Sequence, residues 1–272
     1  MWVDARDKEA LARAGLATLE AMMATTAAQL LRALPDRENW RLELHDAQRG
    51  SRGAYLKKHH TRTWGQWLRA KLGAGTVATP GRVEAENIER LARDGIPAMR
   101  LMAWGEKLHR DGLLESFVLT EELAGYTQLD HFLPTRFAPQ VHDGAKPRNR
   151  DLDRLIRDVA ALARRFHQCG YNHRDLYCCH FFVREDAPGE FRVHLIDLQR
   201  VQHRRRFRWR WLVKDLAQLA YSAPRDRISC TQQMRFIKTY LGVPKLRPID
   251  KRLIRRVLLK KWFMERKLGA SQ

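Results

Sequence analysis

Several features common in other protein classes are missing from this sequence. No window approaches the roughly 18 uninterrupted apolar residues that a helix needs to cross a bilayer. The charged, mixed N-terminus lacks the apolar core of a signal peptide, so we expect a cytoplasmic protein. Cysteine is scarce, with four residues, no CxxC pair and two neighbours at Cys178 and Cys179, which argues against a disulfide framework or a zinc site.

Acidic residues are also few compared with basic ones. The sequence has 31 Asp and Glu against 51 Lys and Arg, for a net charge of +20. This excess predicts an anionic partner, which could be nucleic acid, a membrane or an acidic substrate. Because 44% of its 272 residues are hydrophobic, the chain can bury a large core and is not a disordered basic tail. We expect one large or two small domains, without internal repeats.

The pattern of apolar residues divides the chain into a sheet-rich and a helix-rich half. Apolar residues at helical spacing from about Asp7 to Leu34 predict one or two helices, an N-terminal extension over residues 1–39 that packs on the main domain. The elements expected next are two strands of a hairpin, a helix and two strands: Trp40–His45, Gly53–His59, Arg82–Asp94, Ala98–Trp104 and Ser116–Thr120. Those of the second half are a helix, two strands and further helices: Asp151–Cys169, Phe181–Val183, Val193–Ile196, segments from Lys214 onward and Lys251–Lys267.

The most informative motif is the run from Asn172 to His180, which contains His173, Arg174 and Asp175. It lies between a long predicted helix and an apolar strand, and Asp197 ends another short strand 22 residues after Asp175. Protein-kinase-like folds hold a catalytic base and a magnesium ligand in this way. We therefore expect Asp175 to orient an attacking hydroxyl or accept its proton, and Asp197 to bind Mg²⁺.

Two further charged residues occur upstream in the order that phosphoryl transfer requires. Lys57, in a predicted strand, could neutralise the phosphates of ATP, and Glu84 on the next helix could fix its flexible side chain. Glu86 is the alternative partner. Because Glu84 and Glu86 are two residues apart, they lie on different faces of the helix, and only one of them can pair with the lysine. Lys58 is the alternative lysine, and strand alternation favours Lys57, because Lys58 shares a face with the apolar Leu56.

With these motifs the chain resembles the lipopolysaccharide core heptose kinases, a branch of the protein-kinase-like superfamily. The runs NHRDLYCCHFFV, LIDLQR, YLKKH and VEAENIERL carry the resemblance, which extends from about Trp40 to the mid-250s. It implies an α+β, bilobal protein-kinase-like fold, with a small antiparallel-sheet N-lobe over residues 40–124 and a helical C-lobe over 125–272. It also implies ATP-dependent phosphorylation of a sugar hydroxyl, a heptose of the acidic lipopolysaccharide inner core, at the cytoplasmic face of the inner membrane.

The same resemblance implies roles for other residues. The backbone of Glu121, Glu122 and Leu123 would bind adenine at the hinge. His180 occupies the position of a second magnesium-binding Asn in protein kinases, and because imidazole is a poor Mg²⁺ ligand we expect it to contact phosphate, hold a metal-bound water or brace the loop. No GxGxxG run precedes Lys57, which leaves the turn over residues 48–53 as the candidate for covering the phosphates.

Other residues of the motif region are expected to be mainly structural. We expect His173 and Arg174 to orient Asp175 and its loop. Asp215 matches the position from which a helix anchors this loop. Cys178 and Cys179 are interpreted as packing residues.

The basic run RVQHRRRFRWR over residues 200–210 follows the predicted magnesium strand. It is either a solvated charged stretch or a substrate-binding segment, since Arg binds carboxylate and phosphate oxygens in pairs. In the second interpretation the acceptor contacts come from Arg200, Arg204, Arg205 and Arg206. The final predicted helix would pack on the C-lobe or lie on an anionic membrane surface.

Two other functions compete with a glycolipid kinase. A protein or small-molecule kinase of the same fold would carry a longer activation segment with an APE-like end, which the sequence between Asp197 and Asp215 lacks. A nucleic-acid-binding protein would account for the net charge and the Arg/aromatic run. It would leave the set of Lys57, Glu84, Asp175 and Asp197 unexplained.

Overall fold

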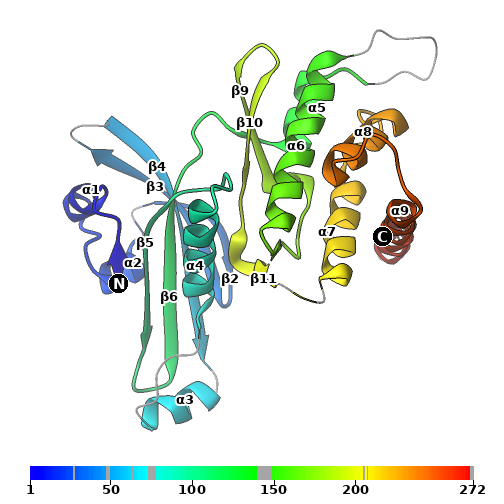
Figure 1. Ribbon diagram of the computed structural model, residues 1–272. Helices are drawn as coiled ribbons and strands as arrows, with labels where there is room; N and C mark the ends of the chain where they lie inside the picture. Colours follow the sequence, from blue (N-terminus) through cyan, green and yellow to red (C-terminus); the bar gives the residue numbers. More distant parts are fainter. Residues whose placement is uncertain are drawn as a thin grey trace. The chain divides into compact units, whose positions relative to one another are not determined.

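The chain forms two compact units (Figure 1). The computed structural model describes residues 1–26, 28–46, 50–62, 64–72, 78–139, 149–204, 206 and 208–269. Unit 1 comprises Met1–Arg93 and Ala98–Ala124, and unit 2 comprises Asp94–Pro97 and Gly125–Gln272. The chain therefore enters unit 2 briefly over Asp94–Pro97 and passes into it for the rest of its length between Ala124 and Gly125.

Unit 1 is built on an antiparallel sheet that, among the described residues, has six strands in the order β1-β5-β6-β4-β3-β2. The strands are β1 (Trp2–Val3), β2 (Gln29–Leu34), β3 (Arg37–Asp46), β4 (Gly50–Arg62), β5 (Leu101–Leu108) and β6 (Leu113–Glu121). The helices are α1 (Lys8–Arg13), α2 (Leu19–Ala24), α3 (Trp64–Lys71) and α4 (Pro80–Arg93). The predicted hairpin, helix and following strands are thus confirmed, whereas α3 was not predicted.

The prediction of helix up to Leu34 is wrong for its last part. Residues Gln29–Leu34 form β2, which pairs antiparallel with β3 across a turn at Pro35 and Asp36. The segment QLLRAL consists of good helix formers, so its local preference is overridden by the hydrogen bonds that β3 offers at the edge of the sheet.

The N-terminal helices complete the core of unit 1. Leu11, Leu16, Leu19 and Met22 are buried in one cluster with side chains of β3, β4, β5 and β6. This confirms that the N-terminal residues pack against the main domain, and it makes them part of unit 1.

Unit 2 is mostly helical. Its helices are α5 (Leu129–Arg136), α6 (Arg150–Gln168), α7 (Trp209–Ser222), α8 (Cys230–Leu241) and α9 (Pro248–Gly269). Its short strands are β7 (Thr127–Gln128), β8 (Tyr171–Asn172), β9 (Phe181–Ala187), β10 (Glu190–Leu195) and β11 (Gln202–His203). They pair as β10-β9-β7 and as β11-β8, so the loops that follow β8 and β10 carry the motif residues.

Helix α9 packs on the rest of unit 2 along one side only. Leu253 and Val257 are buried, and α9 lies against α7. Leu258, Trp262 and Phe263 remain between 44% and 55% exposed. The predicted packing of the last helix is confirmed, and its outer face stays accessible.

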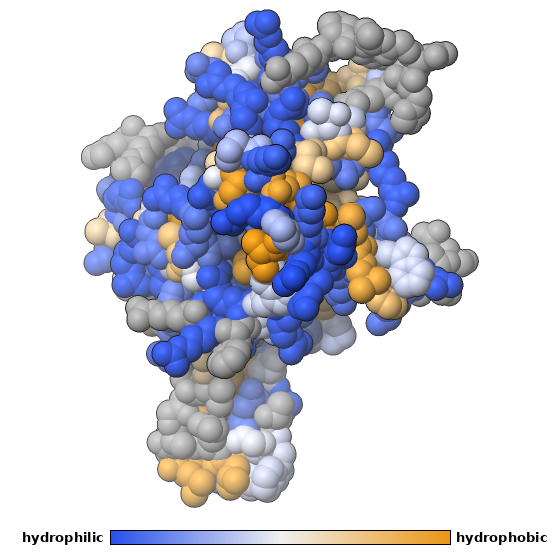
Figure 2. Space-filling model, turned by 45° about the vertical axis from the view of Figure 1, so that its right-hand side comes forward, coloured by the Kyte–Doolittle hydropathy of each residue, from blue (hydrophilic) through white to orange (hydrophobic). Residues whose placement is uncertain are grey.

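The surface reflects the charged composition. The face drawn in Figure 2 is mostly hydrophilic, with apolar patches of limited size between the charged groups. Among the described residues, no helix combines the length and the apolar character needed to span a membrane.

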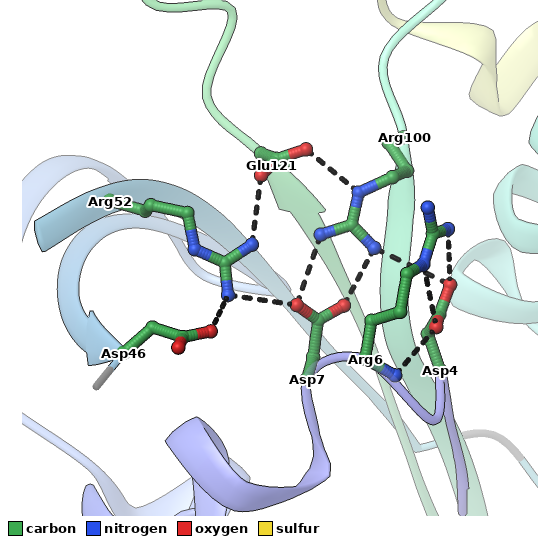
Figure 3. Close-up of polar contacts among 7 residues, drawn as sticks. All are labelled: Asp4, Arg6, Asp7, Asp46, Arg52, Arg100 and Glu121. Atoms are coloured by element: carbon green, nitrogen blue, oxygen red, sulfur yellow. Dashed lines mark hydrogen bonds and ion pairs between the residues drawn. The ribbon is translucent and has the colours of Figure 1, made fainter. Parts of the chain in front are cut away.

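A network of charged side chains joins the N-terminus to the end of β6 (Figure 3). Asp7 is fully buried and accepts hydrogen bonds from Arg52, at 3.1 Å, and from both terminal nitrogens of Arg100, at 2.7 and 3.0 Å. The same two arginines bind Glu121 at 3.0 and 2.7 Å. Asp46 adds a further contact to Arg52. Asp7 thus holds together β4, β5 and the residue at which β6 ends.

We predict that Asp7→Ala lowers the free energy of unfolding by about 3 kcal/mol at neutral pH, because two partly buried guanidinium groups lose a shared carboxylate. Urea denaturation followed by circular dichroism measures the change. Glu9→Ala is the control, since the exposed Glu9 pairs with Arg13 on the helix surface and its loss should change stability little. Equal stability of Asp7→Ala and wild type would contradict the prediction.

Candidate active-site residues

The structure brings Lys57 and Glu84 together within unit 1. Lys57 Nζ on β4 donates to Glu84 Oε1 on α4 over 2.7 Å, and Glu84 is fully buried. Helix α4 is positioned by Pro80 in its first turn and by the Thr79 hydroxyl, which accepts from the Arg82 amide. The alternative partner Glu86 instead forms ion pairs with Arg82 and Arg90 on the helix surface.

The alternative lysine has a different role. Lys58 lies on the opposite face of β4, where its ammonium group donates to the carbonyls of Met23 and Thr25 at the C-terminal end of α2. A cation is favoured there because the carbonyls at a helix end are unsatisfied and partly negative. Burial lowers the pKa of Lys58. The two lysines thus lie on opposite faces of β4, as strand alternation predicts, and Lys57 is the one that reaches Glu84.

The predicted hinge residues have acidic side chains that are already engaged. Burial alone would raise the pKa of Glu121, but hydrogen bonds and charge from Arg100 and Arg52 outweigh it and hold this pKa below its usual range. Glu122 binds Arg41 and Tyr55, and the Arg41 hydrogen bond is the main cause that lowers its pKa. These contacts occupy both carboxylates and fix the backbone of the segment. The predicted contact with adenine would therefore come from backbone groups.

The backbone of this segment is mostly paired. The amides of Glu121, Glu122 and Ala124 donate to Arg100, Gly53 and Glu122 carbonyls, respectively. Within the described part of the chain, no partner is found for the Leu123 amide. Of the predicted adenine contacts, the Leu123 N–H is therefore the available donor.

The structure describes only the last part of the turn that was expected to cover the phosphates. Gln48 and Arg49 are outside the described residues, and residues 50–53 belong to β4, paired with β3. Gly53 has a packing role, because a Cβ at this position would lie 1.6 Å from Glu122 Oε2. The Pro35–Asp36 turn, at the other end of β3, is the turn nearer to Lys57, because Arg37 pairs with His59, two residues from Lys57.

In unit 2, the loop after β8 is anchored by Asp215 on α7. The two carboxylate oxygens of this fully buried residue accept the amides of His173 and Arg174, each over 2.8 Å. Arg174 adopts a left-handed conformation, with φ of 70°, that these two bonds stabilise. The expected anchoring by Asp215 is confirmed.

His173 connects the loop to the strand that leads to Asp197. Its ring is fully buried, and its Nε2 donates to the Ile196 carbonyl over 3.1 Å. Burial lowers the pKa of His173 to about 4, so the imidazole is neutral at physiological pH. The ring of His180 stacks on it with centroids 5.4 Å apart. His173 thus ties the loop to the backbone just before Asp197, which agrees with the orienting role expected for it.

The carboxylate of Asp175 is surrounded by donors from unit 2. Arg200 Nη1 lies 2.7 Å from one oxygen, while Lys214 Nζ and Gln218 Nε2 lie 3.7 and 3.4 Å from the other. Burial lowers the pKa of Lys214. Lys214 and Gln218 were not identified from the sequence. Their spacing of four on α7, either side of Asp215, was the signal that could have indicated them.

Asp197 and His180 face each other. Asp197 has a left-handed backbone with φ of 56°, and its Oδ2 lies 3.8 Å from His180 Nε2. The other ring nitrogen of His180 donates to the Asp175 carbonyl over 2.5 Å. This bond braces the loop from the side of Asp197, which agrees with one of the roles expected for His180.

The residues present are compatible with magnesium but not with a metal bound by protein alone. The described part of the chain contains no group of three or more His, Cys, Asp and Glu side chains that could hold a metal ion. Mg²⁺ usually takes one or two carboxylates and completes its shell with water and substrate phosphates. The partly exposed carboxylate of Asp197 suits that pattern.

The arginines after Asp197 fall into two groups. Arg204 and Arg206 are exposed, and Arg200 contacts Asp175, while Arg205 lies outside the described residues. Arg208 turns inward and donates to the Tyr171 carbonyl and to Asn172 Oδ1, at 2.8 and 3.2 Å. One arginine of the run therefore holds β8 in place.

The cysteines of the loop behave as packing residues. Cys178 is buried, and burial raises the pKa of its thiol to about 12, which keeps it protonated. Burial also raises the pKa of Cys179. Neither thiol is activated as a nucleophile, which agrees with the sequence interpretation.

We predict that the protein loses stability as the pH falls from about 6.5 to about 4. Burial lowers the pKa of both His59 and His173 to about 4, whereas the unfolded chain takes up these protons near pH 6.5. The unfolded state therefore binds more protons in this window, and the free energy of unfolding rises with pH there and levels off above it. Urea titrations across pH 4–7 measure the slope. In His59→Gln this slope should be smaller by about one proton, and an unchanged slope would contradict the assignment.

Comparison with known proteins places the chain among lipopolysaccharide kinases. The model of the lipopolysaccharide kinase (Kdo/WaaP) family matches residues 10–240. The lipopolysaccharide core heptose(I) kinase WaaP of Pseudomonas aeruginosa is 34% identical over 196 residues, 71% of either chain. WaaP of Escherichia coli K12 is 30% identical over 219 residues, 79% of this chain and 78% of that one.

A solved structure described as WaaP in complex with acyl carrier protein is similar over 99% of both chains. Its TM-score is 0.70 and its sequence identity 29%. This likeness, together with the antiparallel sheet of unit 1 and the helices of unit 2, confirms the expected α+β, protein-kinase-like fold class.

Proposed function

This chain belongs to the lipopolysaccharide kinase (Kdo/WaaP) family, and from that premise we propose that it transfers the γ-phosphoryl group of ATP to a heptose hydroxyl of the lipopolysaccharide inner core. The observation that carries the proposal is the setting of Asp175. Its loop is anchored through two backbone amides by Asp215, and its carboxylate contacts Lys214 and Arg200. A fixed carboxylate among cations suits the positioning of a hydroxyl next to a phosphoryl group.

Unit 1 would bind the nucleotide. Lys57, held by Glu84, would contact the α- and β-phosphates, and the Leu123 amide would donate to adenine. We assign the cover of the phosphates to the Pro35–Asp36 turn, because its register places it closer to Lys57 than the start of β4. Backbone amides of a short turn can contact phosphate oxygens even without glycines.

Asp197 would bind magnesium, with His180 in support. The ion supplies charge neutralisation on the β- and γ-phosphates when it is bound. His180 donates from Nδ1 to the Asp175 carbonyl, so its Nε2 carries the lone pair when the ring is neutral. A water molecule of the ion, or a phosphate through such a water, is the natural partner for this nitrogen.

Asp175 would act on the acceptor. One carboxylate oxygen would accept the proton of the sugar hydroxyl. At the same time the hydroxyl oxygen would form a bond to the γ-phosphorus, and the bond between this phosphorus and the bridging oxygen of ADP would break. Lys214, close to the same carboxylate, would offset the negative charge of the transferred group. Arg200 must leave Asp175 or share it with the acceptor, because its guanidinium occupies one oxygen of the carboxylate.

The remaining arginines would bind the acidic acceptor. Arg204 and Arg206 are exposed and follow Arg200 by four and six residues, and their guanidinium groups would bind carboxylate or phosphate on inner-core sugars. Arg205 is included in this proposal from the sequence alone. Since the acceptor is part of a glycolipid, we also propose that the protein acts as a peripheral protein on the cytoplasmic face of the inner membrane.

We predict that Asp175→Ala abolishes phosphate transfer, with a loss of at least about a hundredfold in kcat, while the protein stays folded. Transfer of labelled phosphate from ATP to purified lipopolysaccharide core measures the loss, and thermal unfolding checks the fold. Asp226→Ala, at a largely exposed aspartate of the same unit, is the matched control and should keep its activity. Full activity of Asp175→Ala would contradict the proposed role of Asp175 in phosphate transfer.

A second kinetic prediction concerns the acceptor. The double variant Arg204→Glu and Arg206→Glu should raise KM for the glycolipid at least tenfold and change KM for ATP little, because the reversed charges repel an anionic sugar. Lys245→Glu, an exposed charge reversal on the connection between α8 and α9, is the control. Equal increases in both KM values would show that the arginines have no specific role toward the acceptor.

A further inference from the structure

Helix α3 presents an apolar face to solvent. Trp64 is 74% exposed, Trp67 40%, Leu68 36% and Leu72 73%. Positions 64, 67, 68 and 72 lie along one side of a helix, and the amide of Leu72 donates to the Leu68 carbonyl, which continues the helical turn. At the lower end of Figure 2, where Figure 1 places α3, apolar side chains form the surface.

The helix is attached at Trp67, through its backbone and Cβ, while Trp64 and Leu72 of the apolar face stay mostly exposed. The backbone of Trp67 lies against Gly112, in the turn between β5 and β6, so closely that a Cβ on Gly112 would be 2.7 Å from Trp67 Cα. Gln66 adds a hydrogen bond of 3.0 Å to the Thr61 hydroxyl. An amphipathic helix of a globular domain normally turns its apolar side to the core. In α3 that side remains available for an external partner.

The charge around α3 favours an anionic partner. The sequence contains no Asp or Glu between Asp46 and Glu84, but it includes Arg62 just before the helix and Lys71 at its end. The Lys71 ammonium lies 5.4 Å from the ring of Trp67. Among the described residues, the acidic side chain with a recorded contact here is Asp111, which pairs with Arg62.

These observations identify the kind of partner. Tryptophan and leucine together with basic residues are typical of helices that lie in the interface of a bilayer, with the apolar side at the acyl boundary and the cations near anionic headgroups. We propose that α3 docks the protein on an anionic bilayer by inserting Trp64 and Leu72. The inference rests on the proposed function, because a glycolipid acceptor requires an approach to a membrane surface.

The test uses the full-length double variant Trp64→Glu and Leu72→Glu. These are the two most exposed apolar side chains of α3, so their replacement removes little packing. Cosedimentation with vesicles of phosphatidylglycerol and phosphatidylethanolamine should show binding of the wild type and at least tenfold weaker binding of the variant. Vesicles of phosphatidylcholine should bind both proteins weakly, because they lack the negative surface charge.

The matched control is Leu30→Glu and Leu31→Glu, which adds the same two charges to leucines of unit 1 that are each 48% exposed. This control should bind anionic vesicles like the wild type. Equal weakening in both double variants, wild-type binding of the α3 variant, or absence of wild-type binding to anionic vesicles would each overturn the proposal. The last result would point to a protein partner for the apolar face.

An activity measurement separates this inference from the proposed function. With a delipidated core oligosaccharide as acceptor, the α3 variant should match the wild type, while on lipopolysaccharide embedded in anionic vesicles its rate should fall severalfold. Lack of wild-type activity on both acceptors would contradict the proposed function without bearing on vesicle binding. Equal losses of the variant on both acceptors would overturn the docking role.

Discussion

The buried carboxylate of Asp215 is the interaction on which the candidate active site of unit 2 depends. Its two oxygens accept the amides of His173 and Arg174, and through them it fixes a left-handed residue immediately before Asp175. A residue in this conformation persists only where its surroundings compensate for the strain. The side chain of His173 then ties the same loop to Ile196, so that the position of Asp197 also follows from this anchor.

A comparable arrangement organises unit 1. Asp7, near the N-terminus, shares Arg52 and Arg100 with Glu121, the last residue of β6. On the same face of β4 as Arg52, Lys58 joins the end of α2, while Lys57, on the opposite face, reaches Glu84. The N-terminal segment is thus coupled through buried charges to the residues proposed to bind the nucleotide. A charge in such a position is expensive to leave unpaired, which explains why the network is closed on itself.

The net charge of +20 has several uses within the molecule. Some arginines, such as Arg208 and Arg100, stabilise the fold through carbonyls and carboxylates. Others, such as Arg204 and Arg206, are exposed where an acidic acceptor is proposed to bind. A third group lies close to α3 along the chain, in a stretch without acidic residues, and includes Lys71, whose ammonium lies over the ring of Trp67. Composition alone cannot separate these uses, because each depends on what lies opposite the cation.

The sequence by itself determined most regular elements and indicated the candidate residues of the site, because motif spacing and the periods of strands and helices are local properties. It indicated Asp175, Asp197 and the pairing of Lys57 with Glu84. Only the tertiary structure decided that residues 29–34 form an edge strand, that Lys214 approaches Asp175 and that Pro35–Asp36 is the turn nearer to Lys57. Each of these depends on strand register or on contacts between segments distant in sequence, which override local propensity and leave no periodic signal in the chain.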